Sequence, residues 1–587
     1  MILPLTMTRN ARWVRALFIC LLLLAPVAAR ADAEGVVRYG VTPQALQDQF
    51  FDGYGKDGYR PARLTGYTSG ESVRYFTRWI RNADGRLWSG YFGKTGAEHH
   101  ELFLALRSQG YRPVDVSGYN TPHGVRYAAL WEQNTAGVDW RLHRDVSRPG
   151  MQELVDTIGE QGWVPRRVEA YLIGGDSHYI SIWEHAPGEG YRMHNKMTRE
   201  QYQEHLDTYR GQGLALVHLD AHTADGEVYY AGIWRPSNSF PAVRTNRDWR
   251  RFQRYYNNYW VDGYSIDNFY AAETPEGVRY GGIWFFDGAP NIDENSSLSL
   301  RVRKEVDGAP ARGGAAIVNL TTGQEVMLHA DQEFAVASTS KIGILYALLR
   351  EVDLGNESWT AEINSGNQYG NNQGNWVSAD TDYTIAQMAG FMIRSSNNWA
   401  TNRLIQRIGR ATINQHLDGL GLNVTRIHRY MLGTGSPSAH GNSSAYQDHV
   451  EGWENLSTPR EMVTLLRKVR SDNVLGPLSE LRFWATLKLD GNNDGINNKS
   501  YVPSFVNPLF NPAITFFNKP GNVDDIRAHR ADAGAMVMPD GEVVLYAIFM
   551  DEISDDPDVP GVVSNATLNA ATSAIRNAGK EAAVEYY

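Results

Sequence analysis

The C-terminal half of this sequence is organised around the stretch FAVASTSKIGILYALL, residues 334–349. In this stretch Ser338 opens an almost wholly apolar helix, and Lys341 follows three residues later on the same helix face. A serine at a helix start has its own backbone N–H pointing outward, where it can bind an oxyanion. A lysine in an apolar wall has a lowered pKa and can accept the serine's proton. The spacing predicts acyl transfer by a Ser-Lys pair.

The residues on either side of this stretch indicate an α+β domain. Apolar periodicity and turn residues place the elements, and Thr458-Pro459-Arg460-Glu461 has the capping threonine, first-turn proline and capping-box glutamate of a helix start. The predicted elements are strands at 315–318, 325–328, 535–538 and 543–549, and helices that begin at Ile385 and Thr458 and span 566–583. We expect an antiparallel sheet flanked by helices from both ends of the domain, with a helical subdomain between.

Two further motifs follow the Ser-Lys pair along the chain. Ser396-Asn397-Asn398 comes directly after the helix that begins at Ile385, and Lys519-Pro520-Gly521 lies where a strand is expected. Together with Ser338-x-x-Lys341, they resemble the three motifs of the serine β-lactamase and penicillin-binding protein family, closest to the class A type. That family has Ser-Asp-Asn as its second motif and Lys-Thr-Gly as its third. The resemblance covers about 290 residues, from Leu298 onward.

The resemblance implies a role for each matching residue. Ser338 would be the nucleophile, Lys341 would accept its proton, and Ser396 would relay a proton to the leaving amine. Lys519 would add positive charge and orient Ser396. The implied substrate-binding residues are Asn398 for the substrate amide, Gly521 and Asn522 on the strand beside the site, and Arg530, with Arg527, for a carbonyl or carboxylate. The backbone N–H groups of Ser338 and Asn522 would form the oxyanion hole.

This sequence departs from the family pattern in two places. Pro520 replaces a threonine or serine, which removes a hydroxyl that helps β-lactamases hold the substrate carboxylate and also removes a backbone donor. Class A enzymes carry the deacylation base on a loop before the helix that begins here at Thr458. The corresponding stretch is longer and rich in glycine, and Glu451 and Glu454 are its candidates, with Lys341 as the alternative base.

Literal matches elsewhere are rejected because their context is wrong. Ser471-Asp472-Asn473 lies after the Thr458 helix, and Lys94-Thr95-Gly96 precedes the nucleophile by more than two hundred residues. His143-Arg144-Asp145 lacks the phosphate-binding glycine loop of a kinase. Asp490 to Gly495 begins like a calcium loop, but Tyr501 occupies the place of the bidentate glutamate, so we favour a plain turn. We predict no metal site and no cofactor.

The N-terminal half is a tandem repeat. Tryptophans recur at intervals of 52, 52, 51 and 50 residues, each with a tyrosine four residues before it and a glycine further upstream. The repeated tryptophans are Trp79, Trp131, Trp183, Trp234 and Trp284, and the glycines are Gly58, Gly110, Gly162, Gly213 and Gly263. Each unit predicts a short amphipathic helix, a turn at the glycine and a β-hairpin. We expect the aromatic residues to form the core between units.

These boundaries give a domain organisation and a second resemblance. We expect a signal peptide at 1–31, a five-unit repeat domain at 35–287, a linker at 288–297 and the catalytic domain at 298–587. Units of about 50 residues that begin Gly-Tyr-Arg-Pro, joined to a β-lactamase-like domain, resemble the secreted polyglycine hydrolases and their bacterial relatives. Members of that family cut glycine-rich peptide. The resemblance implies a peptide substrate, possibly rich in glycine.

Composition sets the remaining limits. Three arginines precede an apolar run and the small-residue cleavage site Ala29-Arg30-Ala31, so we expect a secreted or periplasmic protein. The one cysteine, Cys20, lies inside this signal, so the mature chain would have no disulfide. A net charge of −10 with no basic run argues against nucleic acid, and no later segment is long enough to cross a membrane.

Three functions fit these observations. The first is a secreted Ser-Lys serine hydrolase that cuts peptide amide bonds through an acyl-enzyme. The second is a β-lactamase or a cell-wall D-Ala peptidase, against which Pro520 argues. The third is a binding protein built on the repeats with an inactive hydrolase domain. Because every motif keeps its reactive groups, the sequence favours an enzyme over the third function.

Overall fold

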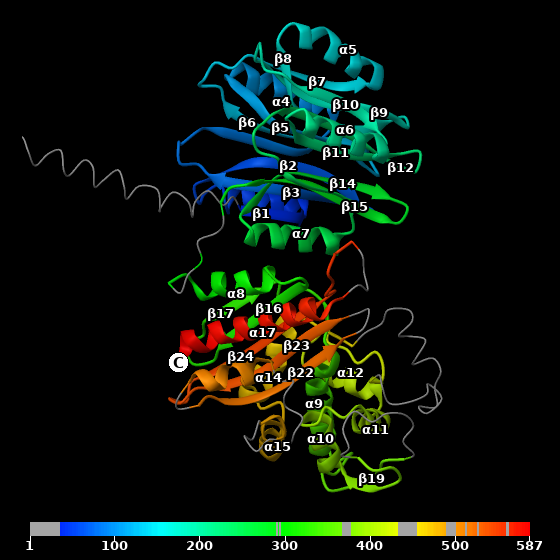
Figure 1. The fold of residues 1–587 in the computed structure, drawn as a ribbon, viewed down its shortest axis with the longest axis vertical. Helices are drawn as coiled ribbons and strands as arrows, with labels where there is room; N and C mark the ends of the chain where they lie inside the picture. Colours follow the sequence, from blue (N-terminus) through cyan, green and yellow to red (C-terminus); the bar gives the residue numbers. More distant parts are fainter. Residues whose placement is uncertain are drawn as a thin grey trace, which may run out of the picture. The chain divides into compact units, whose positions relative to one another are not determined.

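The computed structural model describes residues 36–288, 292, 295–366, 377–431, 455–488, 501–510, 513–524, 528–558 and 563–587 (Figure 1). The predicted signal peptide, with Cys20, and the stretch from Asp490 to Gly495 lie outside the described residues. The chain forms two compact units that divide between residues 289 and 290, with Trp260–Asp262 also assigned to the second unit. Among the helices described, none is long and apolar enough to span a membrane. The two units are described in turn.

The first unit contains five copies of one motif, in which a strand and a helix precede a β-hairpin. In each copy the last hairpin strand lies in the middle of a three-stranded antiparallel sheet. The sheets, in spatial order, are β1(Val36–Val41)–β3(Ser72–Arg81)–β2(Tyr59–Ser69), β4(Trp88–Lys94)–β6(Gly124–Gln133)–β5(Tyr111–Thr121), β7(Trp140–Ser147)–β9(Asp176–His185)–β8(Trp163–Ile173), β10(Arg192–Met197)–β12(Glu227–Pro236)–β11(Leu214–Ala224) and β13(Ala242–Arg247)–β15(Gly277–Phe286)–β14(Tyr264–Thr274). The helices are α3(Pro43–Phe51), α4(Gly96–Ser108), α5(Arg148–Glu160), α6(Arg199–Gly211) and α7(Trp249–Val261).

The repeat prediction is confirmed, with one strand added to each copy. The repeated glycine follows each helix in the left-handed region, as at Gly110 with φ 81°, where a side chain would be strained. All five repeated tryptophans are fully buried, which confirms that they form the core. The strand before each helix was not predicted. In β10, for example, Arg192–Met197 reads RMHNKM, which lacks the apolar alternation that identifies a strand.

The five sheets close into a ring through the first strand of each hairpin, which we call the inner strand because it faces the inside of the ring. Contacts join β2 to β5, β5 to β8, β8 to β11, β11 to β14, and β14 back to β2. Polar side chains from one copy bind the backbone of the next: Asp115 accepts the Leu64 N–H at 2.7 Å, and Asn268 accepts the Leu219 N–H at 2.8 Å. These bonds satisfy backbone groups that the paired strands would otherwise leave buried without partners.

The second unit is built on a five-stranded antiparallel sheet, which confirms the α+β prediction. Its order is β17(Glu325–Leu328)–β16(Arg312–Asn319)–β24(Val543–Asp551)–β23(His529–Val537)–β22(Thr515–Val523). Helices α8(Leu298–Asp307) and α17(Asn565–Tyr586), from the two ends of the domain, cover one face with apolar side chains (Figure 1). The other face packs on a helical part. The edge strand β22 carries the Lys519-Pro520-Gly521 motif, and a strand at a sheet edge tolerates proline.

The helical part surrounds one almost wholly buried helix, α9(Lys341–Asp353). Around it lie α10(Ile385–Ile393), α11(Asn398–Ile408), α12(Arg410–Gly419), α14(Pro459–Ser471) and α15(Pro477–Leu487). Thr458 caps α14 as predicted, because its hydroxyl accepts the Glu461 N–H at 3.0 Å. The predicted capping box does not form, since the Glu461 carboxylate instead accepts backbone N–H groups of the loop before it, including that of Thr425 at 2.6 Å.

Candidate active site

Ser338 lies in a tight turn directly before α9. The turn is a 3-10 helix, η1(Ala337–Ser340), and α9 begins only at Lys341, so the serine stands ahead of the α-helix rather than opening it as predicted. Ala337 adopts φ 41°, a left-handed conformation that is strained for a residue with a side chain. Ser338 is half-buried, and none of the hydrogen bonds of the described residues involves its hydroxyl. The hydroxyl is available to attack.

Lys341 is fully buried and holds the second motif through three contacts. Its Nζ lies 2.8 Å from the Ser396 carbonyl oxygen, 2.8 Å from Asn398 Oδ1 and 3.1 Å from Ser396 Oγ. Burial, and then the positive charge of Lys519, hold the pKa of Lys341 well below its ordinary value. When this amine loses a proton, its two remaining N–H groups can donate to the two carbonyl-type oxygens, and its lone pair can accept a hydroxyl proton.

The second motif is a strained loop between α10 and α11. Ser396 adopts φ 52°, which turns its carbonyl and its hydroxyl towards the same amine of Lys341. Asn397 caps α11, since its side chain accepts the Ala400 N–H at 2.8 Å. The helix cap and the lysine contacts together hold the Ser396 backbone in a conformation that serine rarely adopts, and this fixes the position of its hydroxyl.

The third motif places strand β22 directly against the nucleophile turn. A β-carbon added to Gly521 would lie 2.7 Å from the Val336 carbonyl oxygen and 2.9 Å from the backbone nitrogen of Ser338. Only glycine allows this approach, so the family's third-motif glycine has a steric cause here. The Thr339 hydroxyl donates to the Lys519 carbonyl at 3.2 Å, and Lys519 Nζ donates to the Pro520 carbonyl at 2.8 Å. The first contact holds the strand on the turn, whereas the second lies within the strand itself.

The remaining predicted substrate-binding residues differ in their placement. Asn522 follows Gly521 on β22, and its side chain lies 3.5 Å from the Asp524 carboxylate. Arg530 points to the opposite sheet face, where it contacts Thr572 of α17, the Val523 carbonyl at 2.8 Å and Asp524 at 2.5 Å. Its guanidinium is therefore engaged in binding the end of β22 to α17. Arg527, Glu451 and Glu454 lie outside the described residues.

The rejected motif matches have structural roles in the described part of the chain. Thr95 caps α4 in the first unit, and Asp472 ends α14. Asp145, from the His-Arg-Asp match, accepts the Tyr171 hydroxyl at 2.8 Å within the third copy and the Tyr127 hydroxyl of the second copy at 2.5 Å. The described residues contain no group of acids, histidines or cysteines that could hold a metal ion. None of the three matches lies at the Ser-Lys site.

Sequence analysis did not identify Asn455, which supports the turn that carries Ser338. The Asn455 carbonyl accepts the Val336 N–H at 3.2 Å, while its side-chain oxygen accepts the N–H groups of His428 and Arg429 at 2.9 and 3.0 Å. It thereby joins the segment before η1 to the segment after α12. A lone asparagine outside any motif carries no signal of this role, because its partners are backbone groups distant in sequence.

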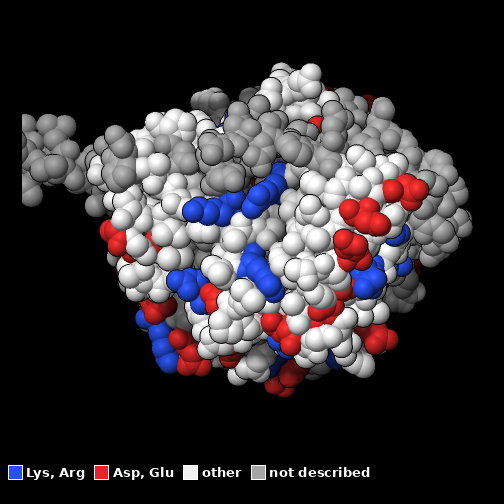
Figure 2. Space-filling model, turned by 90° about the horizontal axis from the view of Figure 1, so that it is seen from below, with Lys and Arg blue, Asp and Glu red and all other residues white. Residues whose placement is uncertain are grey.

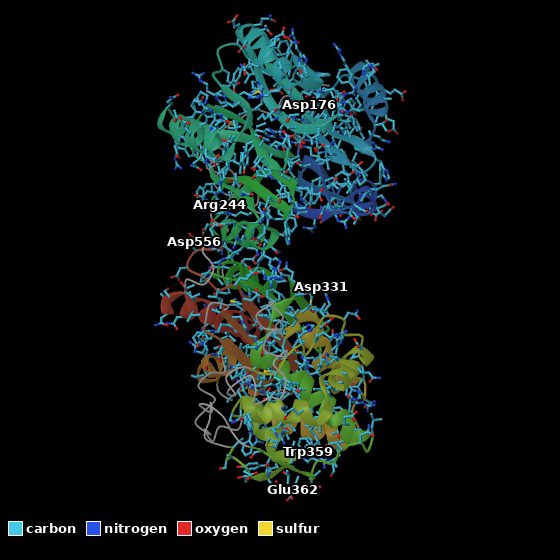
Figure 3. The ribbon with its side chains drawn as sticks, turned by 90° about the vertical axis from the view of Figure 1, so that its right-hand side faces the viewer. Asp176, Arg244, Asp331, Trp359, Glu362 and Asp556 are labelled. Carbon is cyan, nitrogen blue, oxygen red and sulfur yellow. The ribbon has the colours of Figure 1, made fainter. Side chains whose placement is uncertain are left out.

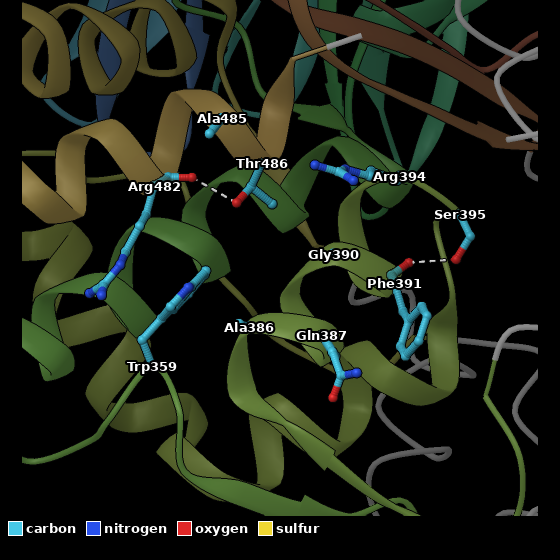
Figure 4. Close-up of a pocket in the computed structure, with 10 residues that line it drawn as sticks. All are labelled: Trp359, Ala386, Gln387, Gly390, Phe391, Arg394, Ser395, Arg482, Ala485 and Thr486. Carbon is cyan, nitrogen blue, oxygen red and sulfur yellow. Dashed lines mark hydrogen bonds between the residues drawn. The ribbon is translucent and has the colours of Figure 1, made fainter. Parts of the chain in front are cut away.

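A pocket of about 540 Å³ adjoins the second motif on the side of α10 and α15. Ser395, one residue before Ser396, forms part of its lining, and the Ser395 hydroxyl is held by the Phe391 carbonyl at 2.7 Å (Figure 4). On another wall the guanidinium of Arg482 lies 5.5 Å from the ring centre of Trp359.

Figure 3 places Trp359 close to Glu362 at the end of this unit. Figure 2 shows Lys and Arg side chains in the middle of the face seen from below.

Comparisons with known proteins match both halves of the chain. A sequence profile described as a beta-lactamase enzyme family matches residues 297–585. A second, described as a polyglycine hydrolase-like structural repeat, matches residues 33–82, 85–134, 137–186 and 188–237. It leaves out the fifth copy, which the structure shows as β13, β14 and β15.

Solved structures match over the second half. PBP-A is 22% identical over 51% of this chain and 99% of its own, with a TM-score of 0.39. A beta-lactamase from Chitinophaga pinensis is 18% identical over 49% of this chain and 100% of its own, with a TM-score of 0.39. One from Sphaerobacter thermophilus is 22% identical over 48% and 95%, with a TM-score of 0.38.

Proposed function

We propose that this chain, in which a domain of the beta-lactamase enzyme family follows a set of polyglycine hydrolase-like repeats, is a secreted serine hydrolase that cuts peptide amide bonds. The observation that carries the proposal is the environment of Lys341. Its amine is fully buried, is held by two carbonyl-type oxygens and contacts the hydroxyl of Ser396. An amine whose pKa is lowered in this way can act as a general base.

The reaction begins with attack of Ser338 Oγ on the substrate carbonyl carbon. The hydroxyl proton passes to the Lys341 amine as the C–O bond forms, and the N–H groups of Ser338 and Asn522 stabilise the oxyanion, which contributes about 3 kcal/mol. The intermediate collapses as the C–N bond breaks. Lys341 returns its proton through the Ser396 hydroxyl to the leaving amine, and Lys519 favours the negative charge in the site. Water then hydrolyses the ester on Ser338, activated by Lys341, Glu451 or Glu454.

Pro520 supports a peptide rather than a β-lactam as substrate. A β-lactam carries a carboxylate that the third-motif hydroxyl of β-lactamases binds, and proline has no hydroxyl to offer. Arg530, the other candidate for that carboxylate, is engaged with Asp524 and the Val523 carbonyl. An internal peptide bond has no carboxylate at this position, so the missing hydroxyl does not weaken its binding. The repeat resemblance adds glycine-rich peptide as the substrate class, bound with the amide held by Asn398.

The proposal is tested by covalent labelling and by peptide cleavage. Wild-type protein, Ser338→Ala and Ser340→Ala are treated with a fluorophosphonate probe and with a peptide library that contains glycine runs, and cleavage sites are identified by mass spectrometry. Ser340 is a matched control, because its hydroxyl is held by the Ala337 carbonyl at 2.6 Å. We expect labelling and cleavage to be lost only in Ser338→Ala. Labelling of Ser338→Ala at the wild-type level would contradict the proposal.

A β-lactamase or cell-wall D-Ala peptidase is the second candidate, because the family profile includes β-lactam-hydrolysing enzymes in its description. Turnover of a chromogenic cephalosporin separates the two candidates. Rapid hydrolysis of the cephalosporin, with no cleavage of any library peptide, would favour the second.

A further inference from the structure

The repeat ring contains a cavity of about 380 Å³ where its inner strands meet. Its lining combines five arginines with two acids and an apolar wall. The arginines are Arg63, Arg112, Arg166, Arg167 and Arg235, the acids are Glu184 and Asp267, and the apolar wall includes Ile182 and Phe285. All these side chains belong to the first unit. The chain as a whole carries a net charge of −10, so this concentration of arginine is local.

A bulge repeated in every inner strand helps place these side chains. The strand register shifts between Pro165 and Arg167 in β8 and between Ile266 and Asn268 in β14, as it does at the same position in the other three copies. The residues inside these two bulges are Arg166 and Asp267. A bulge turns the side chain of its extra residue away from the regular alternation. The cavity is therefore lined partly by residues that a regular strand would direct elsewhere.

One side of the cavity is an ion-pair chain with more arginines than acids. Glu184 accepts from Arg112 at 2.5 Å and from Arg166 at 2.8 Å, and Glu189 accepts from Arg166 at 2.9 Å and from Arg235. Three guanidiniums thus share two carboxylates. In contrast, Arg60, which stands in the first copy where Arg112 stands in the second, belongs to a balanced group of two arginines and two acids, completed by Arg86, Asp84 and Glu132.

The other side of the cavity has the same imbalance. Asp267 binds Arg63 at 2.7 Å and Arg78 at 3.0 Å, and Asp115 binds Arg167 at 3.0 Å, so three arginines again share two acids. Burial, followed by the charge of Arg63, lowers the pKa of Arg167. Burial and then the charge of Arg166 lower the pKa of Arg235 to about 10. The crowded cations repel each other across the cavity.

Two buried acids nearby reduce this excess without cancelling it. Glu169 and Asp220 lie on the neighbouring inner strands β8 and β11, and both are buried. Burial, then the charge of Asp220, raises the pKa of Glu169 well above its ordinary value, and burial raises the pKa of Asp220 to about 7. Both shifts favour the uncharged carboxyl, so this pair offsets less of the arginine charge than two exposed acids would.

We propose that this cavity binds a small organic dianion, with its phosphate, sulfate or paired carboxylate head between Arg112, Arg166 and Arg235. Guanidiniums bind such oxygens in a bidentate manner and remain charged when partly buried. The apolar body of the ligand would lie against Ile182 and Phe285. The repeat ring would then recognise a ligand independently of the hydrolase site. The observations that support this binding are separate from those that support the catalytic proposal.

The test measures ligand binding to the full chain by calorimetry and by thermal shift. The probes are sodium sulfate, inorganic phosphate and succinate, each compared with sodium chloride at equal ionic strength. We expect at least one dianion to bind and to raise the melting temperature, while chloride does not. Binding of sulfate and phosphate alone identifies a tetrahedral oxyanion head, whereas binding of succinate alone identifies a dicarboxylate. Responses to all three dianions equal to that of chloride would overturn the proposal.

Two variants of Arg235 and one control variant locate the binding. Arg235→Gln should weaken binding about tenfold or more, since it removes one cation from the cavity, whereas Arg235→Lys keeps the charge and should keep most of the affinity. Arg126→Gln is the matched control, because Arg126 lies in the hairpin region of β6 and binds backbone carbonyls there. Circular dichroism verifies that each variant is folded. Equal loss of binding in Arg126→Gln and Arg235→Gln would also overturn the proposal.

Discussion

Arg63 of the repeat ring and Lys341 of the hydrolase domain are both buried cations, but their surroundings move their pKa values in opposite directions. In the ring, burial alone would lower the pKa of Arg63, yet Asp267 and Asp115 outweigh this effect and raise it. In the hydrolase domain, none of the hydrogen-bond partners of Lys341 within the described residues is a carboxylate, and its pKa is lowered well below the ordinary value. A counterion keeps a buried cation charged and structural, whereas neutral acceptors alone turn it into a base.

The largest effect that separates the two regions should come from Lys341→Met. Removing the base should lower kcat about a thousandfold or more, while stability stays the same or rises, because a buried desolvated amine is replaced by an apolar side chain of similar length. Peptide hydrolysis and thermal melting of the same sample measure both quantities. A variant that melts several degrees lower and keeps its activity would show that Lys341 is structural.

Arg167→Met is the equivalent change in the ring, and it should act on stability instead. It leaves Asp115 buried without its cation, which costs about 3 kcal/mol of unfolding free energy at neutral pH. The deficit should shrink as the pH falls, because the unpaired carboxyl has a still higher pKa and takes up a proton in the folded state. Denaturant titrations at several pH values measure this, and hydrolysis should be unaffected.

Gly521→Ala tests the close packing of the third motif on the nucleophile turn. The added carbon meets the Val336 carbonyl and the Ser338 nitrogen, both backbone atoms, so β22 must move away from η1. A displacement of about 1 Å at the oxyanion site should lower kcat about a hundredfold. Gly419→Ala, where a β-carbon meets nothing within 4 Å, is the control and should be fully active. Full activity in both variants would contradict the packing argument.

The smallest effect is a shift in the pH profile on replacing Lys519 by glutamine. The charge of Lys519 helps to lower the pKa of Lys341, so removing it should raise that pKa. Because the base is active when deprotonated, the acidic limb of kcat should move to higher pH, by about one unit. Lys468→Gln, on the exposed side of α14, should leave the midpoint in place. A shift to lower pH in Lys519→Gln would reverse the assigned electrostatics.

The two regions also differ in how far sequence predicts structure. The ring was predicted as five units because Trp79 and its equivalents repeat at a nearly constant period, but its closure was not, since closure depends on contacts such as Asp115 with Leu64 across copies. The helix start at Thr458 was predicted because capping is local. The left-handed Ser396 and the role of Asn455 were not, because distant tertiary contacts impose them.

In the hydrolase motifs, too, local sequence patterns predict some features and not others. The order and spacing of the motifs predicted that Lys341, Ser396 and Asn398 would come together, and oxygens of Ser396 and Asn398 lie within 3.1 Å of the Lys341 amine. The same reasoning placed Arg530 at the substrate, whereas strand alternation directs it to the α17 face. Sequence spacing therefore identifies which residues share a motif better than it identifies where a lone residue points.

Contact between β14 and β2 has a consequence for how the repeat region can change over evolutionary time. An open array can gain or lose a copy at either end, since its outermost members face solvent anyway. A circle has no outermost member. Duplicating or deleting one copy here would break the contact between β14 and β2, so all the remaining sheets would have to shift before the circle could close again.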